Sequence, residues 1–537
     1  MKTIFLLSEA GEDNCLVQGG GLLKTQVLII GGGATGTGLA RDLALRGIQC
    51  LLVEKKDINA GASGGNHGLL HSGARYVASD PGAAQECREE GGLLKRLAPQ
   101  CVEDTGGLFV AVQGDDEKFI AEFPGMCSRS GIPAQIVDLK EARFLEPALS
   151  EKIIAVYAVP DGAIDPFRLS IDNVSQAMEK GSRVLRHTRV LAFNIRDSRI
   201  QSVLLQNSQT GEEIHIEADI IVNAAGAWAG LVAGLAGIAV PVLYSKGSLV
   251  ITHDRLAQRV INRLRPASNA DILVPGGTVS ILGTTSVRIE NPDEVYPTVE
   301  EIDLMIEDAR AMIPALETTR FIRAYSGVRP LIGSQKGGDD RSVSRGFALM
   351  DHSEHGVKNF ITITGGKLTT YRLMAEKTAD LVCHQLGISS PCLTGIEPLP
   401  ASQPAQWTEP AFAPRLWLKG HEQEDVLLCE CEMVSRSAVD SIMDSIHQQG
   451  GRADLQGIGL RSRIGKGPCQ GAFCGPRLTA YLFEKGELDP GRCLDGLRDF
   501  VRSRWKGLYP ILWGEQLQQS ELLEAMHCGI LGLELEE

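Results

Sequence analysis

The 537-residue sequence lacks several features that mark common classes of protein. No stretch approaches 18 consecutive apolar residues, so we expect no helix that spans a membrane. The apolar run at the extreme N-terminus is too short for a secretory signal, and acidic residues follow it at once. With a net charge of −14, the chain also has no basic stripe to neutralise phosphate groups, which argues against a nucleic-acid-binding protein.

The sequence also lacks internal repeats, low-complexity blocks and the even cysteine count of a disulfide framework. Its thirteen cysteines, with no signal peptide before them, favour a reducing, cytosolic setting. The hydrophobic fraction of 43% is ample for two or three domains. We expect an irregular extension at 1–24, an α/β domain at 25–395, a proline-rich linker at 396–423, a cysteine-bearing domain at 424–483 and a tail at 484–537.

A glycine fingerprint follows the first expected buried strand, Val27–Ile30. Gly31, Gly33 and Gly36 form a G-x-G-x-x-G pattern, and a helix over 34–46 should point its positive N-terminus at bound phosphates. A second strand ends at Glu54, where a carboxylate suits hydrogen bonds to ribose hydroxyls. The pattern predicts a dinucleotide site, against the alternative of a plain glycine-rich turn.

The fingerprint alone leaves FAD and NAD open. The segment 221–228, a strand that runs into small residues and Gly226, is typical of the return strand near the cofactor in flavoproteins, although an ordinary strand end would have a similar sequence. We therefore favour FAD. Further buried strands are expected at 50–53, 220–222 and 360–363.

Four cysteines gather in the last fifth of the chain. Cys429-x-Cys431 and Cys469-x4-Cys474 could hold zinc or a 2Fe–2S cluster, since both accept four thiolates. A C-x-C pair is less usual at zinc sites, and glycines near Cys469 leave backbone N–H groups free to hydrogen-bond sulfur. We favour 2Fe–2S, with zinc as the alternative and four unligated thiols as a third possibility.

Three segments carry a resemblance to a known family: 70–76 (LHSGARY), 325–331 (YSGVRPL) and 365–372 (GGKLTTYR). They resemble the FAD-dependent glycerol-3-phosphate dehydrogenases, within the D-amino-acid-oxidase-like class. Shorter matches occur at 271–275 and 505–507. The cysteine segment is similar to the domain of these enzymes that resembles bacterioferritin-associated ferredoxin, although its second pair is more widely spaced than in that ferredoxin. The chain is thus identified as similar to the catalytic subunits of three-subunit anaerobic bacterial members.

The resemblance implies an FAD-binding Rossmann-like fold with a substrate-binding subdomain and a small C-terminal cysteine-cluster domain. It implies oxidation of sn-glycerol 3-phosphate to dihydroxyacetone phosphate, with electrons passing to quinone. The implied partners are a membrane-anchoring iron–sulfur subunit together with a second flavoprotein subunit. The implied location is peripheral, on the cytoplasmic face of the inner membrane.

Two other functions stay open at this point. A flavin enzyme for a 2-hydroxy acid or amino acid, such as 2-hydroxyglutarate, is the alternative. A non-catalytic assembly or iron-sensing subunit is a rival from another class.

The resemblance also assigns roles to individual residues. Arg329 should contact the substrate and Arg345 should be a second substrate arginine, because a guanidinium matches phosphate oxygens. Histidine has a suitable pKa for the base that takes the hydroxyl proton, so His71 is our candidate, with His67 and Lys367 as competitors. The implied cofactor contacts, besides the fingerprint, are Ser63, Gly226, Gly366, Lys367, Leu368 and Thr369; helix capping is the simpler role for the threonine.

One position departs from the family. Where its members carry an arginine that helps to bind the substrate phosphate, this sequence has Gly65. The change should weaken substrate binding, unless another cation substitutes or the substrate differs.

Overall fold

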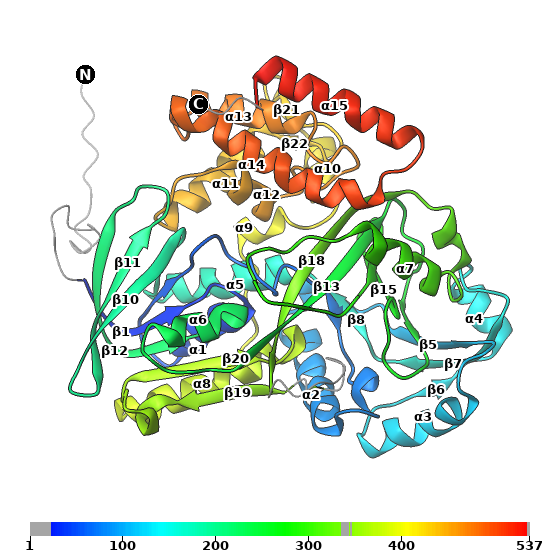
Figure 1. Ribbon diagram of the computed structural model, residues 1–537, viewed down its shortest axis with the longest axis horizontal. Coiled ribbons are helices and arrows are strands. Elements are labelled where there is room, and N and C mark those ends of the chain that lie inside the picture. The colour runs from blue at the N-terminus through cyan, green and yellow to red at the C-terminus, as the bar shows by residue number, and fades with distance from the viewer. Residues whose placement is uncertain (1–22, 334–342, 344–345, 534–537) are drawn as a thin grey trace.

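The computed structural model describes residues 23–333, 343 and 346–533. Two large sheets lie beside each other, and a helical C-terminal unit packs across their shared upper edge in the view of Figure 1. Arg345 and the N-terminal extension to residue 22 lie outside the described residues. No helix in the described part of the chain combines the length and the apolar character needed to cross a membrane.

The first sheet is the nucleotide-binding one. Its central strands are parallel, and three of the four side chains at the end of the first strand are fully buried, as expected for strands covered on both faces. Three helices, α1, α5 and α8, pack their apolar side chains on one face. The elements are β1 (Leu23–Ile30), α1 (Ala34–Leu45), β2 (Cys50–Val53), α5 (Pro166–Glu179), β9 (Arg183–Leu185), β10 (Thr188–Arg196), β11 (Arg199–Asn207), β12 (Glu213–Asn223), β19 (Phe347–Asp351), β20 (Phe360–Gly365) and α8 (Tyr371–Leu386). All four strands expected from the sequence, and the first helix, are confirmed.

The second sheet has nine strands in a mixed arrangement, with the order β17-β13-β16-β15-β14-β5-β7-β6 and β18 paired to β13. It corresponds to the expected substrate-binding subdomain. Its elements are β5 (Gly107–Val112), α3 (Glu117–Arg129), β6 (Gln135–Ile136), α4 (Leu139–Leu145), β7 (Ile153–Val159), β13 (Val242–Thr252), β14 (Val260–Arg263), β15 (Ile272–Gly276), β16 (Val279–Gly283), β17 (Val287–Ile289), α7 (Val299–Ala309) and β18 (Phe321–Ile332). The short strands β3 (Leu69–Leu70), β4 (Val102–Glu103) and β8 (Gly162–Ile164) form a small third sheet. Two further helices are α2 (Pro81–Leu97) and α6 (Ala229–Gly234), and α6 packs on the nucleotide-binding sheet.

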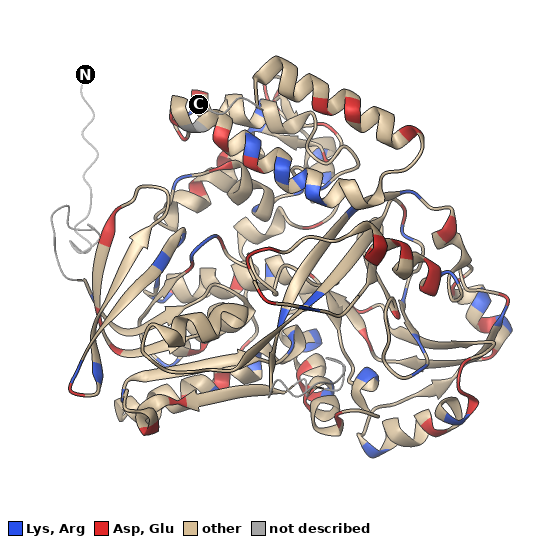
Figure 2. Cartoon of the chain, viewed as in Figure 1, with Lys and Arg blue, Asp and Glu red and all other residues tan. Residues whose placement is uncertain are grey.

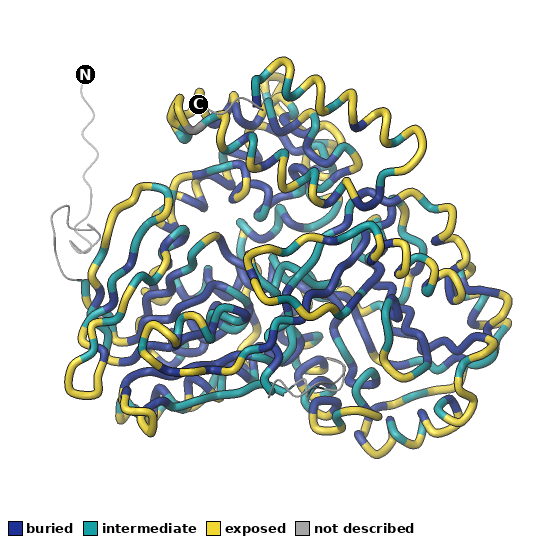
Figure 3. Tube along the Cα trace, in the orientation of Figure 1, coloured by how far each residue is buried: buried dark blue, intermediate teal, exposed yellow. Residues whose placement is uncertain are grey.

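The C-terminal unit is built on one hydrophobic cluster of its own. Its elements are α9 (Gln403–Gln406), α10 (Phe412–Lys419), β21 (Leu427–Cys429), β22 (Val434–Ser435), α11 (Arg436–Gln448), α12 (Leu455–Arg461), α13 (Cys474–Glu484), α14 (Pro490–Leu508) and α15 (Glu515–Leu531). Figure 3 shows that α15 is exposed along most of its length, whereas the sheets are buried through their centres.

Two expected boundaries differ from the structure. The segment 396–423, expected from its prolines to be a linker, contains α9 and α10, and both Trp407 and Ala413 pack against the C-terminal cluster. The tail likewise contributes Leu497 and Phe500 to that cluster. Pro404 and Pro414 lie in the first turns of α9 and α10, where a missing N–H costs little. The cysteine-bearing unit therefore extends on both sides of residues 424–483.

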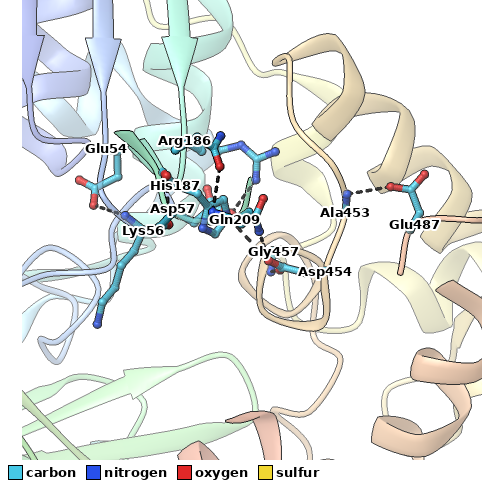
Figure 4. Close-up of polar contacts among 12 residues, drawn as sticks. Glu54, Lys56, Asp57, Arg186, His187, Gln209, Ala453, Asp454, Gly457 and Glu487 are labelled. Atoms are coloured by element: carbon cyan, nitrogen blue, oxygen red, sulfur yellow. Dashed lines mark hydrogen bonds and ion pairs between the residues drawn. The ribbon is translucent and has the colours of Figure 1, made fainter. Parts of the chain in front are cut away.

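A buried ion-pair cluster joins the C-terminal unit to the nucleotide-binding sheet (Figure 4). Asp57, in the loop after β2, accepts hydrogen bonds from Arg186 at 2.9 Å and from Arg461 at 2.7 and 2.9 Å. All three residues are buried. Nearby, Gln209 donates to Asp454 at 3.0 Å. The two guanidinium groups hold the pKa of Asp57 well below its usual range, so the carboxylate is ionised across the physiological range.

Candidate active site

A cavity of about 570 Å³ lies where the two sheets meet. Its wall includes the glycine turn after β1, the acid at the end of β2, the loop 60–67, the end of β18 and the turn before α8. The carboxyl ends of parallel strands are the usual ligand edge of such a sheet. The sequence-predicted cofactor and substrate residues therefore come together around one space, except those discussed below.

The glycine turn has the close contacts that the fingerprint predicts. Gly31 has a φ of +116°, and a Cβ there would lie 2.5 Å from the Ala224 carbonyl oxygen. A Cβ on Gly36 would lie 1.9 Å from the Gly31 oxygen, so α1 can approach the turn only because this residue is glycine. Gly33 is the N-cap of α1. Gly36 thus acts through packing rather than by lining the cavity.

Polar groups prepare the N-terminus of α1 and the ribose acid. Ser63 Oγ accepts a hydrogen bond from the Ala34 N–H at 2.9 Å and lines the cavity. Glu54 accepts from the backbone N–H groups of Gly32 at 2.7 Å and Lys56 at 2.9 Å. Burial raises the pKa of Glu54, and these two donors oppose the rise. The carboxylate is thus held in a fixed orientation at the cavity wall.

Arg329 reaches the cavity from β18. Its Nη1 donates to the Thr285 carbonyl oxygen at 3.2 Å, and its Nη2 donates to the Thr284 hydroxyl. On the neighbouring strand β13, a Cβ at Gly247 would lie 2.3 Å from Nη2. Because residue 247 is a glycine, the Arg329 guanidinium can occupy the space beside it.

Gly65 lies against β18 close to Arg329. A Cβ at Gly65 would lie 2.8 Å from the Gly327 Cα, and one at Gly327 would lie 2.0 Å from the Gly65 oxygen. These two backbones touch because both residues lack a side chain. The position at which the resemblance expects an arginine is therefore filled here by a backbone contact, and an added side chain would have to move one of the two segments.

The turn before α8 supplies Lys367. Gly365 and Gly366 have φ angles of +85° and +71°, which favour glycine. Gly366, Lys367 and Leu368 line the cavity, and the Lys367 Nζ lies 5.3 Å from the centroid of the Tyr76 ring. Thr369 lies behind the wall, where its hydroxyl accepts the His71 backbone N–H at 3.2 Å. Its place fits a role in holding the loop of His71 more than a direct cofactor contact.

Two histidines line the cavity on the loop that precedes α2. His71 Nε2 lies 3.3 Å from the Tyr76 hydroxyl. The His67 ring lies 6.2 Å from that of His71, and its Nδ1 accepts the Leu69 N–H at 3.2 Å. Burial, together with the charges of Arg329 and Arg75, lowers the pKa of His67 to about 3. Its imidazole is therefore neutral, and a weak proton acceptor, at neutral pH.

Sequence reasoning missed Tyr76 and the Arg75–Asp271 ion pair, which also line the cavity. All three lie inside segments that were singled out as motifs, but only the fold shows that they face the same space. Gly226, after β12, lies at the cavity wall, where its carbonyl accepts the Thr364 hydroxyl at 2.9 Å.

The four cysteines lie near one another in the C-terminal unit as neighbouring pairs. Cys431 Sγ lies 3.8 Å from Cys429 and 3.7 Å from Cys469, and Cys474 is hydrogen-bonded to Cys429. Backbone N–H groups of Glu432, Gly465 and Gly471 hydrogen-bond three of the sulfurs. The hydrogen bond from Cys429, aided by Gly465, lowers the pKa of Cys474. In the described part of the chain no group of three or more histidine, cysteine, aspartate or glutamate side chains is placed so that it could hold a metal ion.

Comparison with known proteins places these features. Residues 26–381 match the family described as FAD dependent oxidoreductase. The chain belongs to the FAD-dependent oxidoreductase family.

Relatives named as anaerobic glycerol-3-phosphate dehydrogenase A subunits match this family member over nearly its whole length. The one from Escherichia coli is 42% identical over 96% of this chain and 98% of its own. The one from Haloferax volcanii, named A1, is 39% identical over 94% of this chain and 90% of its own. Within the family, the chain thus groups with the anaerobic glycerol-3-phosphate dehydrogenase A subunits.

Solved structures share the fold. Glycerol-3-phosphate dehydrogenase from Bacillus halodurans, complexed with FAD, has a TM-score of 0.63 and 20% identity, covering 91% of this chain and 96% of its own. Glycine oxidase from Geobacillus kaustophilus has a TM-score of 0.57 and 20% identity, covering 70% and 98%. The family match confirms the expectation of FAD over NAD.

Proposed function

We propose that this FAD-dependent oxidoreductase converts sn-glycerol 3-phosphate to dihydroxyacetone phosphate. The observation that carries the proposal is the similarity, over nearly the whole chain, to proteins named as anaerobic glycerol-3-phosphate dehydrogenase A subunits. The cavity supports it, because Arg329 and Lys367 place two cations at the wall of the space that FAD would occupy. An anionic substrate needs such fixed positive charge.

The residues at the cavity wall fit FAD. Gly31 and Gly33 let a pyrophosphate approach the backbone at the N-terminus of α1, and Glu54 would accept the ribose hydroxyls. The backbone around Gly366 and Lys367 would face the isoalloxazine ring. When bound, FAD supplies the acceptor for hydride from the alcohol carbon.

The substrate would be held and deprotonated by side chains of this chain. Arg329 would bind the phosphate, with its guanidinium preoriented by Thr284 and Thr285. His71 would accept the hydroxyl proton on its ring, and the Tyr76 hydroxyl at 3.3 Å would fix the orientation of that ring. His67 is disfavoured as the base, because its lowered pKa makes the imidazole a weak acceptor. The expected help from Arg345 stays a proposal, since it lies outside the described residues.

The four cysteine sulfurs would hold a 2Fe–2S cluster. One feature supports iron–sulfur over zinc: backbone N–H groups already hydrogen-bond the sulfurs. The cluster would pass electrons onward to a second flavoprotein and to a membrane-anchoring iron–sulfur partner, and then to quinone.

An assembly of several chains is supported by the relatives, which are named as lettered subunits of one enzyme. The exposed apolar side chains of α15, such as Leu522 and Ile530, offer a surface for such partners. The chain would then lie peripherally on the cytoplasmic face of the inner membrane.

One sample can test these proposals. The protein is purified without oxygen, its visible spectrum is recorded, and iron, sulfide and zinc are determined. Glycerol 3-phosphate and 2-hydroxyglutarate are then compared as reductants of a dye. Rapid bleaching of the flavin by glycerol 3-phosphate supports the proposal. Turnover of 2-hydroxyglutarate alone would select the alternative that the missing arginine at Gly65 leaves open, and flavin that no substrate bleaches would select a non-catalytic role.

A further inference from the structure

Two arginines with unsatisfied, buried polar atoms lie where the C-terminal unit meets β18. The Nε and Nη1 atoms of Arg504, and the Nε of Arg323, are buried with no hydrogen-bond partner among the described residues. Each arginine comes from a different unit, since Arg504 is on α14 and Arg323 on β18. Basic residues gather on the C-terminal half of α14, which crosses the top of the second sheet in Figure 2.

Arg504 packs directly on the loop that carries the cysteines. Its guanidinium carbon would lie 3.4 Å from a Cβ at Gly465, the residue whose N–H hydrogen-bonds the Cys474 sulfur. The guanidinium also lies 4.9 Å from the centroid of the Phe500 ring, and Phe500 in turn packs on Gly465 and Gly471. The positive charge of Arg504 therefore lies against the backbone segment that hydrogen-bonds the Cys474 sulfur.

Gly507, in the segment 505–507 that matches the family, explains how Arg323 comes close to α14. A Cβ at Gly507 would lie 2.5 Å from the Ala324 carbonyl oxygen and 2.8 Å from the Arg323 Nε. Only a glycine lets α14 come this close to β18. The segment Arg504–Gly507 thus brings one guanidinium to the cysteine loop and rests on the strand that carries the other and, six residues on, Arg329 of the active site.

Two cations this close need an anion. Burial and the charge of Arg323 lower the pKa of Arg504 to about 9, and the attractive charge it meets is that of Cys474. Burial also lowers the pKa of Arg323, whose attractive neighbour is Tyr325. No carboxylate offsets either charge within the described residues. A buried charge without a partner is strongly unfavourable, so a negatively charged group held by the cysteines would stabilise both guanidinium groups.

We propose that Arg504, with Arg323 behind it, is the counter-charge of the group bound by the four cysteines and makes that group easier to reduce. The inference rests on the 2Fe–2S cluster proposed above. Each electron added to a thiolate-bound cluster increases its negative charge, and a fixed guanidinium beside it stabilises the reduced form. Both arginines are positioning residues, because they act on the cluster through the Gly465 loop.

The test is an EPR-monitored redox titration of the full-length protein with its flavin and reconstituted iron and sulfide. We compare the parent protein with Arg504→Gln, Arg504→Lys, Arg323→Gln and Arg502→Gln, the last an exposed control on the same helix. We expect Arg504→Gln to lower the reduction equilibrium constant of the cluster at least tenfold, a shift of about 59 mV for one electron. Arg323→Gln should shift it less, in the same direction, and Arg504→Lys and Arg502→Gln should stay near the parent value.

The outcomes separate charge from packing. An Arg504→Gln protein with full iron content and an unchanged potential overturns the proposal, as does a lysine variant that shifts as far as the glutamine variant. If the glutamine variant loses its cluster while the lysine variant keeps it, the counter-charge role is supported; loss in both means that the arginine only packs. A parent protein that shows zinc, or no 2Fe–2S signal, sinks the proposed cluster itself and this inference with it.

Discussion

The Arg461 guanidinium of α12 binds both carboxylate oxygens of Asp57, which lies three residues beyond Glu54 in the nucleotide-binding sheet. Asp57 precedes Asn59, whose N–H donates to the Gly32 oxygen of the glycine turn at 3.0 Å. The C-terminal unit thus holds the loop that follows Glu54 and contacts the glycine turn. Because the Asp57–Arg461 ion pair is buried and bidentate, it is strong, and removing one partner is costly.

Arg461→Met should therefore destabilise the protein by about 3–5 kcal/mol, because it leaves the buried Asp57 carboxylate with Arg186 alone. It should also weaken FAD binding. Urea unfolding followed by tryptophan fluorescence measures the first effect, and FAD titration of the apoprotein measures the second. Arg452→Met, at an exposed surface pair, is the control and should change neither. Equal stability of the two variants would mean that the ion pair contributes no net energy.

Gly36→Ala should abolish tight FAD binding. The added methyl would lie 1.9 Å from the Gly31 carbonyl oxygen, so α1 must move away from the phosphate turn. Gly92→Ala is the matched control, since a Cβ there meets nothing within 4 Å on an exposed face of α2. It should keep its FAD and gain up to about 1 kcal/mol of stability from helix propensity. The flavin-to-protein absorbance ratio measures how much FAD each variant retains. A yellow Gly36→Ala protein would contradict the packing argument.

The nucleotide-binding half was predictable because its signals are local. The strand, glycine turn, helix and acid from Val27 to Glu54 follow one another along the chain, and each has its own residue signature. The contacts that complete the site are not local. The Gly65–Gly327 backbone contact and the Asp57–Arg461 pair join residues hundreds of positions apart. The identity of a glycine or an aspartate does not show which distant residue it contacts.

The C-terminal boundaries failed for a different reason. Four prolines in 399–414 suggested an open linker, but proline is also compatible with the first turn of a short helix, and Trp407 anchors this segment to the core. Proline content indicates which backbone conformations a segment can adopt. It does not show whether a large side chain such as Trp407 packs against the core.

Arg329→Gln should lower kcat/KM for glycerol 3-phosphate by about a hundredfold or more, since it removes the planar cation that a phosphate can bind bidentately. Arg329→Lys should recover only part of this loss, because an ammonium cannot reproduce the fork held by Thr284 and Thr285. Arg310→Gln, at an exposed surface pair, is the control. Steady-state dye reduction gives the values, and flavin content confirms that each variant is loaded. A normal KM in Arg329→Gln would assign the phosphate to other cations.

His71→Gln should lower kcat/KM by about 10²–10⁴-fold if this imidazole takes the hydroxyl proton. The loss of rate toward acid pH, where a catalytic base is protonated, should disappear in the same variant. Tyr76→Phe removes the hydroxyl that contacts His71 Nε2 and should cost less, while keeping the acid limb. The measurement is the pH profile of kcat/KM between pH 5 and 9. An unchanged acid limb in His71→Gln would move the base to another residue.

The pH dependence of stability should carry the signature of His67. Its pKa is about 3 in the folded protein, below the ordinary value near 6.5, because burial and two arginines disfavour the charged ring. Between about pH 6.5 and pH 3 the His67 ring is protonated in the unfolded chain but neutral in the folded protein. The contribution of His67 to stability is therefore present above pH 6.5 and is lost as the pH falls toward 3. His67→Gln should make the decline between pH 7 and pH 5 shallower, by less than the roughly 1.4 kcal/mol per pH unit of a full proton, since the ring also faces the cavity. Urea unfolding of the two apoproteins at several pH values gives the slopes, and parallel slopes would show that His67 is protonated equally in both states.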